Sequence, residues 1–201
     1  KVIQWNDMSG NNHAIQGTLA SQPSYTAAIP TLNNHPAVRF DGANDYMNVS
    51  SPLTLGTVFV VSNWGGVETV FPNYNGLLNR ATGVSPYVFI GIGGDSKFHV
   101  GSLGASFYKN SQLTPFYSPL ADYKITSAVA SVPYPNYDLV IGNNPWDAGN
   151  NYWNGNIAEI IVYDTLLTIT QRNQVGQYLS NKYAPPINLG ADIVAYGFCP
   201  V

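Results

Sequence analysis

The stretch of sequence that decides the fold is GNIAEIIVYDTLLTITQRNQVGQYLSNKYA, residues 155–184. Its first part is a β-branched and aromatic run that ends at Asp164, as expected of a strand followed by a turn. Thr168 stands three positions before Gln171, which is the spacing of a helix capping box. Apolar side chains then recur at steps of three and four, at Val175, Tyr178, Leu179 and Tyr183. The stretch therefore predicts a strand, a turn and a helix over residues 169–182 that lays one apolar face on a β-body.

The two ends of the chain lie outside this unit. Pro185 and Pro186 are expected to stop the helix and to begin a stiff linker, so that residues 185–201 form the linker and the start of a following module. The only cysteine, Cys199, lies in that stretch, and a lone thiol does not indicate the compartment. The chain opens with KVIQWND, which is already strand-like, and we expect a further strand upstream of it.

The remainder of the chain alternates short apolar runs with clusters of Gly, Pro, Asn and Ser. The run TVFVVS, residues 57–62, is apolar on both faces and is expected to be a central buried strand. Other strands are expected at residues 37–40, 46–49, 87–92, 97–100, 125–132 and 137–141. Strands at this spacing, in a chain of 201 residues, predict a single all-β domain over residues 1–184, built as a two-sheet antiparallel sandwich or jelly roll with one C-terminal helix.

The composition narrows the range of partners. Charged residues make up 9% of the chain, against about 25% in an ordinary soluble domain, so the surface consists mostly of neutral polar groups. The net charge is −3 and no basic cluster occurs, which argues against nucleic acid. No apolar run is long enough to insert into a membrane. Such a surface is typical of a secreted or cell-surface protein that meets neutral polymers.

Four segments carry a resemblance to a known family. They are WNDMSGNNHA (residues 5–14), PAVRFDGANDYM (residues 36–47), TVFVVS, and IAEIIVYD with its QRNQVGQYLSNKYA helix. In order and spacing they resemble the laminin-G-like, concanavalin A-like jelly-roll domains of bacterial secreted and surface adhesins. The resemblance implies a module of a large multidomain protein, and the tail NLGADIVAYGFCP resembles the start of the Ig-like modules that follow such domains.

Two acidic loops have a structural interpretation and a metal-binding alternative. Asp7, with Ser9, Asn11 and Asn12, can satisfy the amides of its own turn. Asp41 and Asp45 are expected to shape a hairpin connection, although clustered oxygens could also hold calcium. The chain is expected to need no cofactor, with calcium left undecided. The three histidines, His13, His35 and His99, show no zinc-ligand spacing.

Catalysis has little support in the sequence. A retaining glycosidase needs two close carboxyl groups, and the only glutamates, Glu68 and Glu159, have no acidic residue two positions away. No GxSxG nucleophile motif occurs. The chain is therefore expected not to be an enzyme.

Arg39 is alone in an apolar strand and needs an anionic partner among Asp41, Asp45 and Glu159, of which we favour Glu159.

The loop GNNPWDAGNNYWNG, residues 142–155, combines aromatic, amide and carboxylate side chains that suit ligand binding. Aromatic faces suit the C–H face of a sugar, and amide and carboxylate groups suit its hydroxyls. Trp153 precedes a strand and is expected to join the core, whereas Trp146 and Tyr152 are the better candidates. The predicted ligand-binding residues are Trp146, Asp147, Asn150, Asn151 and Tyr152, with Trp64 and Tyr74 from a second cluster that also holds Phe71 and Asn75.

Three classes of function remain open. The favoured class is a non-catalytic module that binds a neutral glycan or polysaccharide for adhesion. The second is a structural spacer or assembly domain whose aromatic groups pack on neighbouring domains, and the third is a divergent carbohydrate-active enzyme. A tyrosine-rich middle could serve adhesion or a neighbouring domain equally well, and it comprises Tyr108, Tyr117, Tyr123, Tyr134 and Tyr137.

Overall fold

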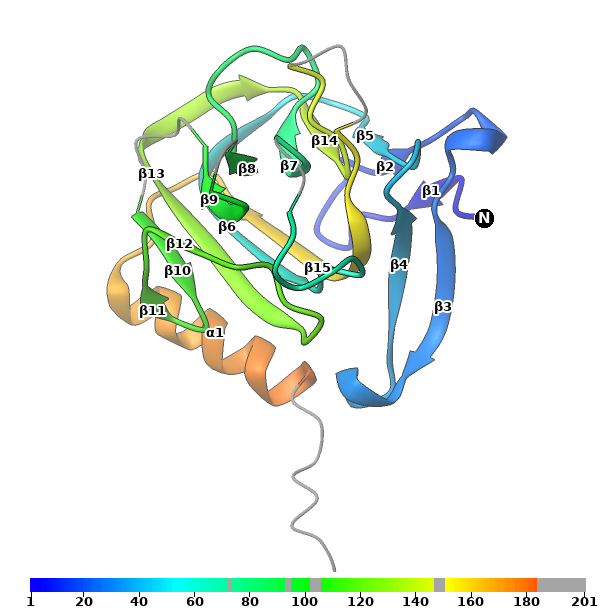
Figure 1. Ribbon diagram of the computed structural model, residues 1–201. Helices are drawn as coiled ribbons and strands as arrows, with labels where there is room; N and C mark the ends of the chain where they lie inside the picture. The colour runs from blue at the N-terminus through cyan, green and yellow to red at the C-terminus, as the bar shows by residue number, and fades with distance from the viewer. Residues whose placement is uncertain (72–73, 93–94, 102–105, 147–150, 184–201) are drawn as a thin grey trace, which may run out of the picture.

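The protein is a two-sheet β-sandwich with one helix packed on its outside, as seen in a computed structural model (Figure 1). The structure describes residues 1–71, 74–92, 95–101, 106–146 and 151–183. All pairings between neighbouring strands are antiparallel across these residues. The predicted fold class, an all-β antiparallel sandwich with a C-terminal helix, is therefore confirmed.

The two sheets draw their strands from the whole described chain. The first has the order β1 (Gln4–Trp5), β2 (Ala14–Ile15), β5 (Met47–Val49), β14 (Leu139–Ile141), β7 (Gly76–Arg80), β8 (Phe89–Ile92), β9 (Lys97–Val100) and β12 (Phe116–Tyr117). The second has the order β11 (Gln112–Leu113), β10 (Ser106–Lys109), β13 (Lys124–Tyr137), β6 (Leu53–Ser62), β15 (Asn154–Tyr163), β4 (His35–Asp41) and β3 (Ser24–Ile29). Two short 3-10 helices, η1 (Leu19–Ser21) and η2 (Pro30–Leu32), flank β3, and α1 spans Ile169–Tyr183.

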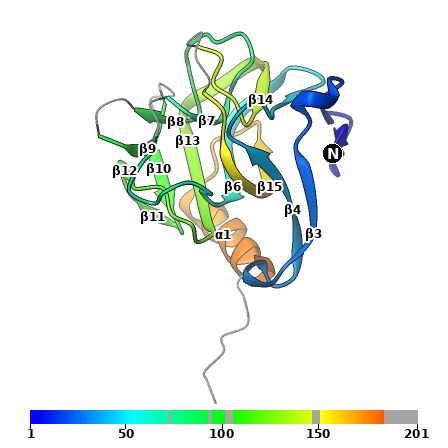
Figure 2. The ribbon, with the colours of Figure 1, turned by 45° about the vertical axis from the view of Figure 1, so that its right-hand side comes forward.

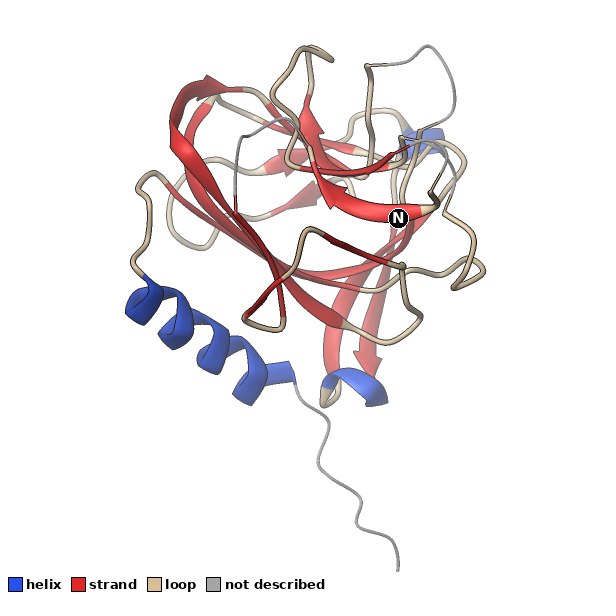
Figure 3. Cartoon of the chain, turned by 60° about the vertical axis from the view of Figure 1, so that its left-hand side comes forward, coloured by secondary structure: helices blue, strands red, loops and turns tan. Residues whose placement is uncertain are grey.

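Strand β6 holds the centre of the second sheet, as its two apolar faces predict. Val58 and Val60 point into the core between the two sheets, while Phe59 and Val61 point into a second core beneath α1. Successive side chains of a strand alternate between its faces, so one continuous apolar run serves both cores. Figure 3 shows α1 lying against the outside of this sheet.

Helix α1 begins and packs largely as its sequence indicates. Gln171 N donates to Thr168 Oγ1 at 3.3 Å, and Thr168 N donates to Gln171 Oε1 at 2.9 Å, which completes a capping box. Leu179 and Tyr183 are buried in the second core. Tyr178 was expected on the same face but is 49% exposed, because it sits at the margin of the apolar stripe.

The expected strands differ from the observed ones mainly around residue 138. The expected runs 125–132 and 137–141 correspond to two strands, but β13 continues to Tyr137 and β14 starts only at Leu139, in the other sheet. The chain thus changes sheets at Asp138. Strands β2, β3, β7, β10, β11 and β12 were not predicted.

No helix in the described part of the chain is long and apolar enough to cross a membrane. The predicted linker, the Ig-like start and Cys199 fall in residues 184–201, outside the described residues. Pro185 and Pro186 also fall there, and α1 ends at Tyr183.

Candidate binding site

The predicted binding loop leaves the first sheet at Gly142, directly after β14. Gly142 has a φ of +82°, and a Cβ at this position would lie 2.4 Å from Phe40 Cδ1. Only glycine fits such a position without strain. Gly142 N donates to Leu77 O at 2.8 Å, and Trp153 N donates to Gly142 O at 2.9 Å. The base of the loop is therefore fixed to the sandwich at both ends.

Buried asparagine side chains build the inside of this region. Asn144 is fully buried, and its Nδ2 donates to Tyr74 O at 2.7 Å. Asn75 Nδ2 donates to Tyr152 O at 2.6 Å, and the backbone of Asn151 accepts from Asn144 N at 3.1 Å. Asn151, predicted to contact a ligand, is only 6% exposed. These amides satisfy loop backbone, which is what buried polar groups require.

Three aromatic rings gather on the outer side of this asparagine scaffold, and we name them the Trp146 platform. Trp146 is 52% exposed. Its ring lies edge to face with Tyr74, at 5.1 Å between centroids, and with Tyr87 at 6.2 Å. Tyr87 is fixed in turn, because its hydroxyl donates to Gly83 O at 3.1 Å. The platform offers an open indole supported by two tyrosines.

The backbone of Tyr74 is strained. Its φ is +61°, in the left-handed region that side-chain-bearing residues rarely adopt. Such a conformation costs on the order of 1–3 kcal/mol and persists only when the surroundings enforce it. The hydrogen bond from Asn144 to the Tyr74 carbonyl supplies part of that enforcement.

The other predicted site residues separate into distinct places. Tyr152 is half-buried and pairs with Tyr46, at 6.3 Å between ring centroids, and no ring contact joins it to Trp146. Trp64, expected at the surface, is only 3% exposed and packs on Trp153 at 5.3 Å. Its apolar indole is covered by the sandwich, so it belongs to the core. The prediction that Trp153 joins the core is confirmed. Asp147 and Asn150 lie outside the described residues.

The second cluster and the tyrosine-rich middle also contribute to the core. Phe71 is buried beside Trp64, so Tyr74 is the one ring of that cluster left near the surface. Tyr137 is fully buried, and Tyr117 stacks on Phe107 with an angle of 2° between the ring planes.

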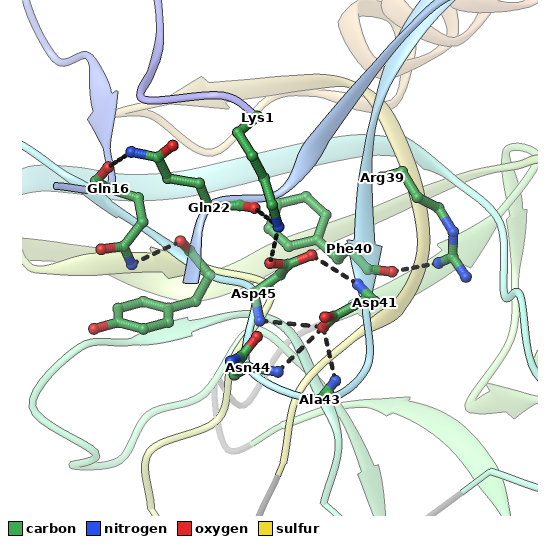
Figure 4. A network of polar contacts seen from close by, with 10 residues as sticks. Lys1, Gln16, Gln22, Arg39, Phe40, Asp41, Ala43, Asn44 and Asp45 are labelled. Atoms are coloured by element: carbon green, nitrogen blue, oxygen red, sulfur yellow. Dashed lines mark hydrogen bonds and ion pairs between the residues drawn. The ribbon is translucent and has the colours of Figure 1, made fainter. Parts of the chain in front are cut away.

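The acidic loop after β4 is held by its own backbone and by Lys1 (Figure 4). Asp41 Oδ1 accepts from the backbone N–H groups of Ala43, Asn44 and Asp45. Although partial burial acts in the opposite direction, these bonds lower the pKa of Asp41. Burial, reinforced by the charge of Asp41, raises the pKa of Asp45.

Lys1 supplies a positive charge beside the carboxylates of this loop. Its Nζ lies 3.5 Å from Asp45 Oδ1 and donates to Gln22 O at 2.5 Å (Figure 4). Asp7 likewise accepts from the amides of Ser9 and Asn12, and these bonds lower its pKa. Within the described ranges, no three His, Cys, Asp or Glu side chains gather as metal ligands.

The prediction that Arg39 pairs with Glu159 is wrong. Arg39 instead donates to Phe40 O and to Asn154 Oδ1. Glu159 pairs with Lys182 of α1 at 3.1 Å, because the helix brings a lysine over this part of β15. Burial lowers the pKa of Arg39, against the opposing charges of Asp41 and Asp45. Arg39 thus balances its charge with backbone and amide oxygens and with distant carboxylates.

The other residues considered for catalysis or metal binding, Glu68 and the three histidines, each contact a different partner. Glu68 Oε1 accepts from Ala121 N at 3.1 Å, far along the chain from the Glu159–Lys182 pair. His13 Nδ1 accepts from Asp7 N, His35 lies against the Tyr183 ring, and His99 Nε2 lies 2.9 Å from Asp95 Oδ2. Each histidine therefore has a local structural contact of its own.

No protein-family model matches the chain, and searches of curated proteins and of solved structures find no significant match.

Proposed function

We propose that this chain is a non-catalytic glycan-binding and adhesion module of a secreted or cell-surface multidomain protein, of the laminin-G-like kind. Its partner is a neutral glycan or polysaccharide. The charge-poor composition supports this assignment, since a surface with few charges does not rely on long-range attraction to an ionic partner. The observed sandwich is compatible with that family, and the four sequence segments support the finer assignment.

The observation that carries the proposal is the exposure of Trp146 on a rigid support. Half of the Trp146 indole is exposed, and aromatic rings beside a few fixed polar groups are typical of ligand sites. Tyr74 and Tyr87 brace the ring, and the buried Asn144 holds the loop beneath it. A pre-formed aromatic surface loses little conformational entropy when a sugar stacks on it.

A glycan array tests the proposal with the wild type, Trp146→Ala and Tyr25→Ala. Tyr25 is 59% exposed on β3 and is a matched control, since it is an exposed aromatic residue outside the platform. We expect at least one neutral glycan whose binding Trp146→Ala abolishes and Tyr25→Ala retains, with and without a calcium chelator. The proposal is refuted if Trp146→Ala weakens the binding of no glycan, or if the wild type binds none.

A second candidate, an assembly domain, is favoured by one feature. Strand β3 is an edge of the second sheet, and its sequence SYTAAI has no charged residue or proline to block pairing with another chain. If the module assembles through this edge, Ala27→Lys should abolish association in sedimentation experiments. Sedimentation of the wild type as a monomer at all concentrations, alone and mixed with its neighbouring modules, would exclude this candidate.

A further inference from the structure

A groove of about 690 Å³ is lined by residues none of which belongs to the Trp146 platform. It opens between the C-terminal half of α1 and the β3–β4 connection, which Figures 1 and 2 show next to one another below the second sheet. Asn33 Nδ2 donates to Lys182 O at 3.2 Å, and the rings of His35 and Tyr183 meet at 5.2 Å. These contacts fix the spacing of the two walls.

The groove has an apolar floor and aromatic sides. Val61 of β6, Ile125 of β13 and Leu179 of α1 line it from the second core. The half-buried Tyr123 adds ring surface, and Tyr183, which is only 7% exposed, closes one side. A volume of this size falls within the range of small-ligand sites, which combine mostly apolar walls with a few oriented polar groups.

Three asparagine side chains line the groove, and bonds to the protein itself hold each of them in a fixed orientation. Asn156 Nδ2 donates to Asn63 Oδ1 at 3.1 Å, and Asn63 Nδ2 donates to Ala121 O at 2.8 Å. Asn110 Oδ1 accepts from Ile125 N at 3.0 Å. Because these bonds fix the amides before any ligand arrives, binding costs little side-chain entropy.

The facing wall carries hydroxyl groups, and the groove has no net charge. Thr31 and Ser180 are both exposed and line the groove from η2 and from α1. The only charged residues in its described lining are Asp122 and Lys124, whose side chains lie 3.8 Å apart and offset one another. A cavity of this kind favours an uncharged ligand with many hydroxyl groups.

We propose that this groove is a second binding site, for an uncharged oligosaccharide. The apolar floor and the tyrosine rings suit the C–H face of a pyranose, and the amide and hydroxyl groups suit its hydroxyls. The site shares no residue with the Trp146 platform and does not depend on the function proposed for it. With both sites, one module would hold two saccharide segments at once.

An NMR titration of the ¹⁵N-labelled chain tests this site with three probes: cellobiose, maltose and N,N′-diacetylchitobiose. Ser180→Trp fills the groove from an exposed helix position, and Gln177→Trp places the same ring elsewhere on the exposed helix surface as the matched control. We expect at least one probe to shift the amides of Ile125 and Asn156 in a saturable manner. The shifts should persist in Gln177→Trp and Trp146→Ala, and Ser180→Trp should weaken binding at least about tenfold.

Thr31→Trp blocks the groove from the other wall, so the same titration can be carried out on it if Ser180→Trp does not fold. The proposal is overturned if no probe shifts these amides in the wild type. It is also overturned if the shifts survive both blocking variants. Loss of platform binding alone, in Trp146→Ala, would leave the groove shifts intact, so the two sites fail separately.

Discussion

The side chain of Asn144 binds the backbone carbonyl of Tyr74 across two loops, with 2.7 Å between Nδ2 and the carbonyl oxygen. Asn144 is fully buried, and Tyr74 has a left-handed backbone at the edge of the Trp146 platform. One amide group thus holds the loop that follows β14 to the loop that precedes β7.

Asn144→Ala should therefore destabilise the protein and disorder the platform. The Tyr74 carbonyl would lose its partner in this partly buried bond, which costs about 1–3 kcal/mol of unfolding free energy. Urea denaturation measures the loss, and Asn173→Ala, at an exposed position of α1, is the control. Equal stability of the two variants would show that the bond contributes nothing.

Three of the four tryptophans, Trp64, Trp146 and Trp153, should differ sharply in their effect on stability. Trp64→Ala and Trp153→Ala each open a cavity in the sandwich core and should cost about 3–5 kcal/mol. Trp146→Ala removes an exposed ring and should change the unfolding free energy by less than about 1 kcal/mol. Chemical denaturation of the three variants checks this order, and a core-sized loss at Trp146 would contradict its exposure.

Acidification should weaken the fold as the pH falls through about 4, the ordinary pKa of an aspartate. Partial burial acts to raise the pKa of Asp138, but the bonds from Arg80 and Thr82 lower it overall. A lowered folded pKa means that the unfolded chain binds more protons at this pH, so stability is present above the unfolded pKa and is lost below it.

Asp138→Asn should flatten this part of the pH profile of the unfolding free energy. The pair is partly exposed, so the change should be modest. Asp45, whose pKa is raised, acts in the opposite sense: its contribution is largest at low pH and falls as the pH rises through its folded pKa. A profile that is unchanged in Asp138→Asn would show that another carboxylate dominates.

Thr168→Ala should remove one half of the capping box and destabilise α1 by about 1 kcal/mol. Thr168→Ser keeps the hydroxyl and should retain most of the stability. Thermal unfolding followed by circular dichroism distinguishes the two variants. Identical melting temperatures would indicate that tertiary packing alone starts the helix.

The sequence predicted the parts of the fold that depend on local pattern. The two-faced run of β6, the capping box and the core position of Trp153 could be recognised from neighbouring residues alone. Strand β13 could not be bounded, because Pro133 and Pro135 resemble a loop, whereas the structure accommodates them where the pairing with β6 is irregular.

The candidate site was only partly predictable, for a different reason. The asparagines near Trp146 have a composition that fits a sugar site, but Asn75 and Asn144 bond to loop backbone instead. Composition cannot tell an amide that faces a ligand from one that faces its own chain. The groove beneath α1 joins residues from distant segments, so no local spacing could indicate it.

The central position of strand β6 limits how the protein can unfold locally. Val60 faces the inter-sheet core and Phe59 faces the core beneath α1, so neither layer can open widely without exposing one side of the same strand. Local opening events should therefore spare β6, and its amide protons should exchange with deuterated solvent only through global unfolding. The slowest-exchanging amides of the chain are expected between Val58 and Val61, with those of β3 among the fastest.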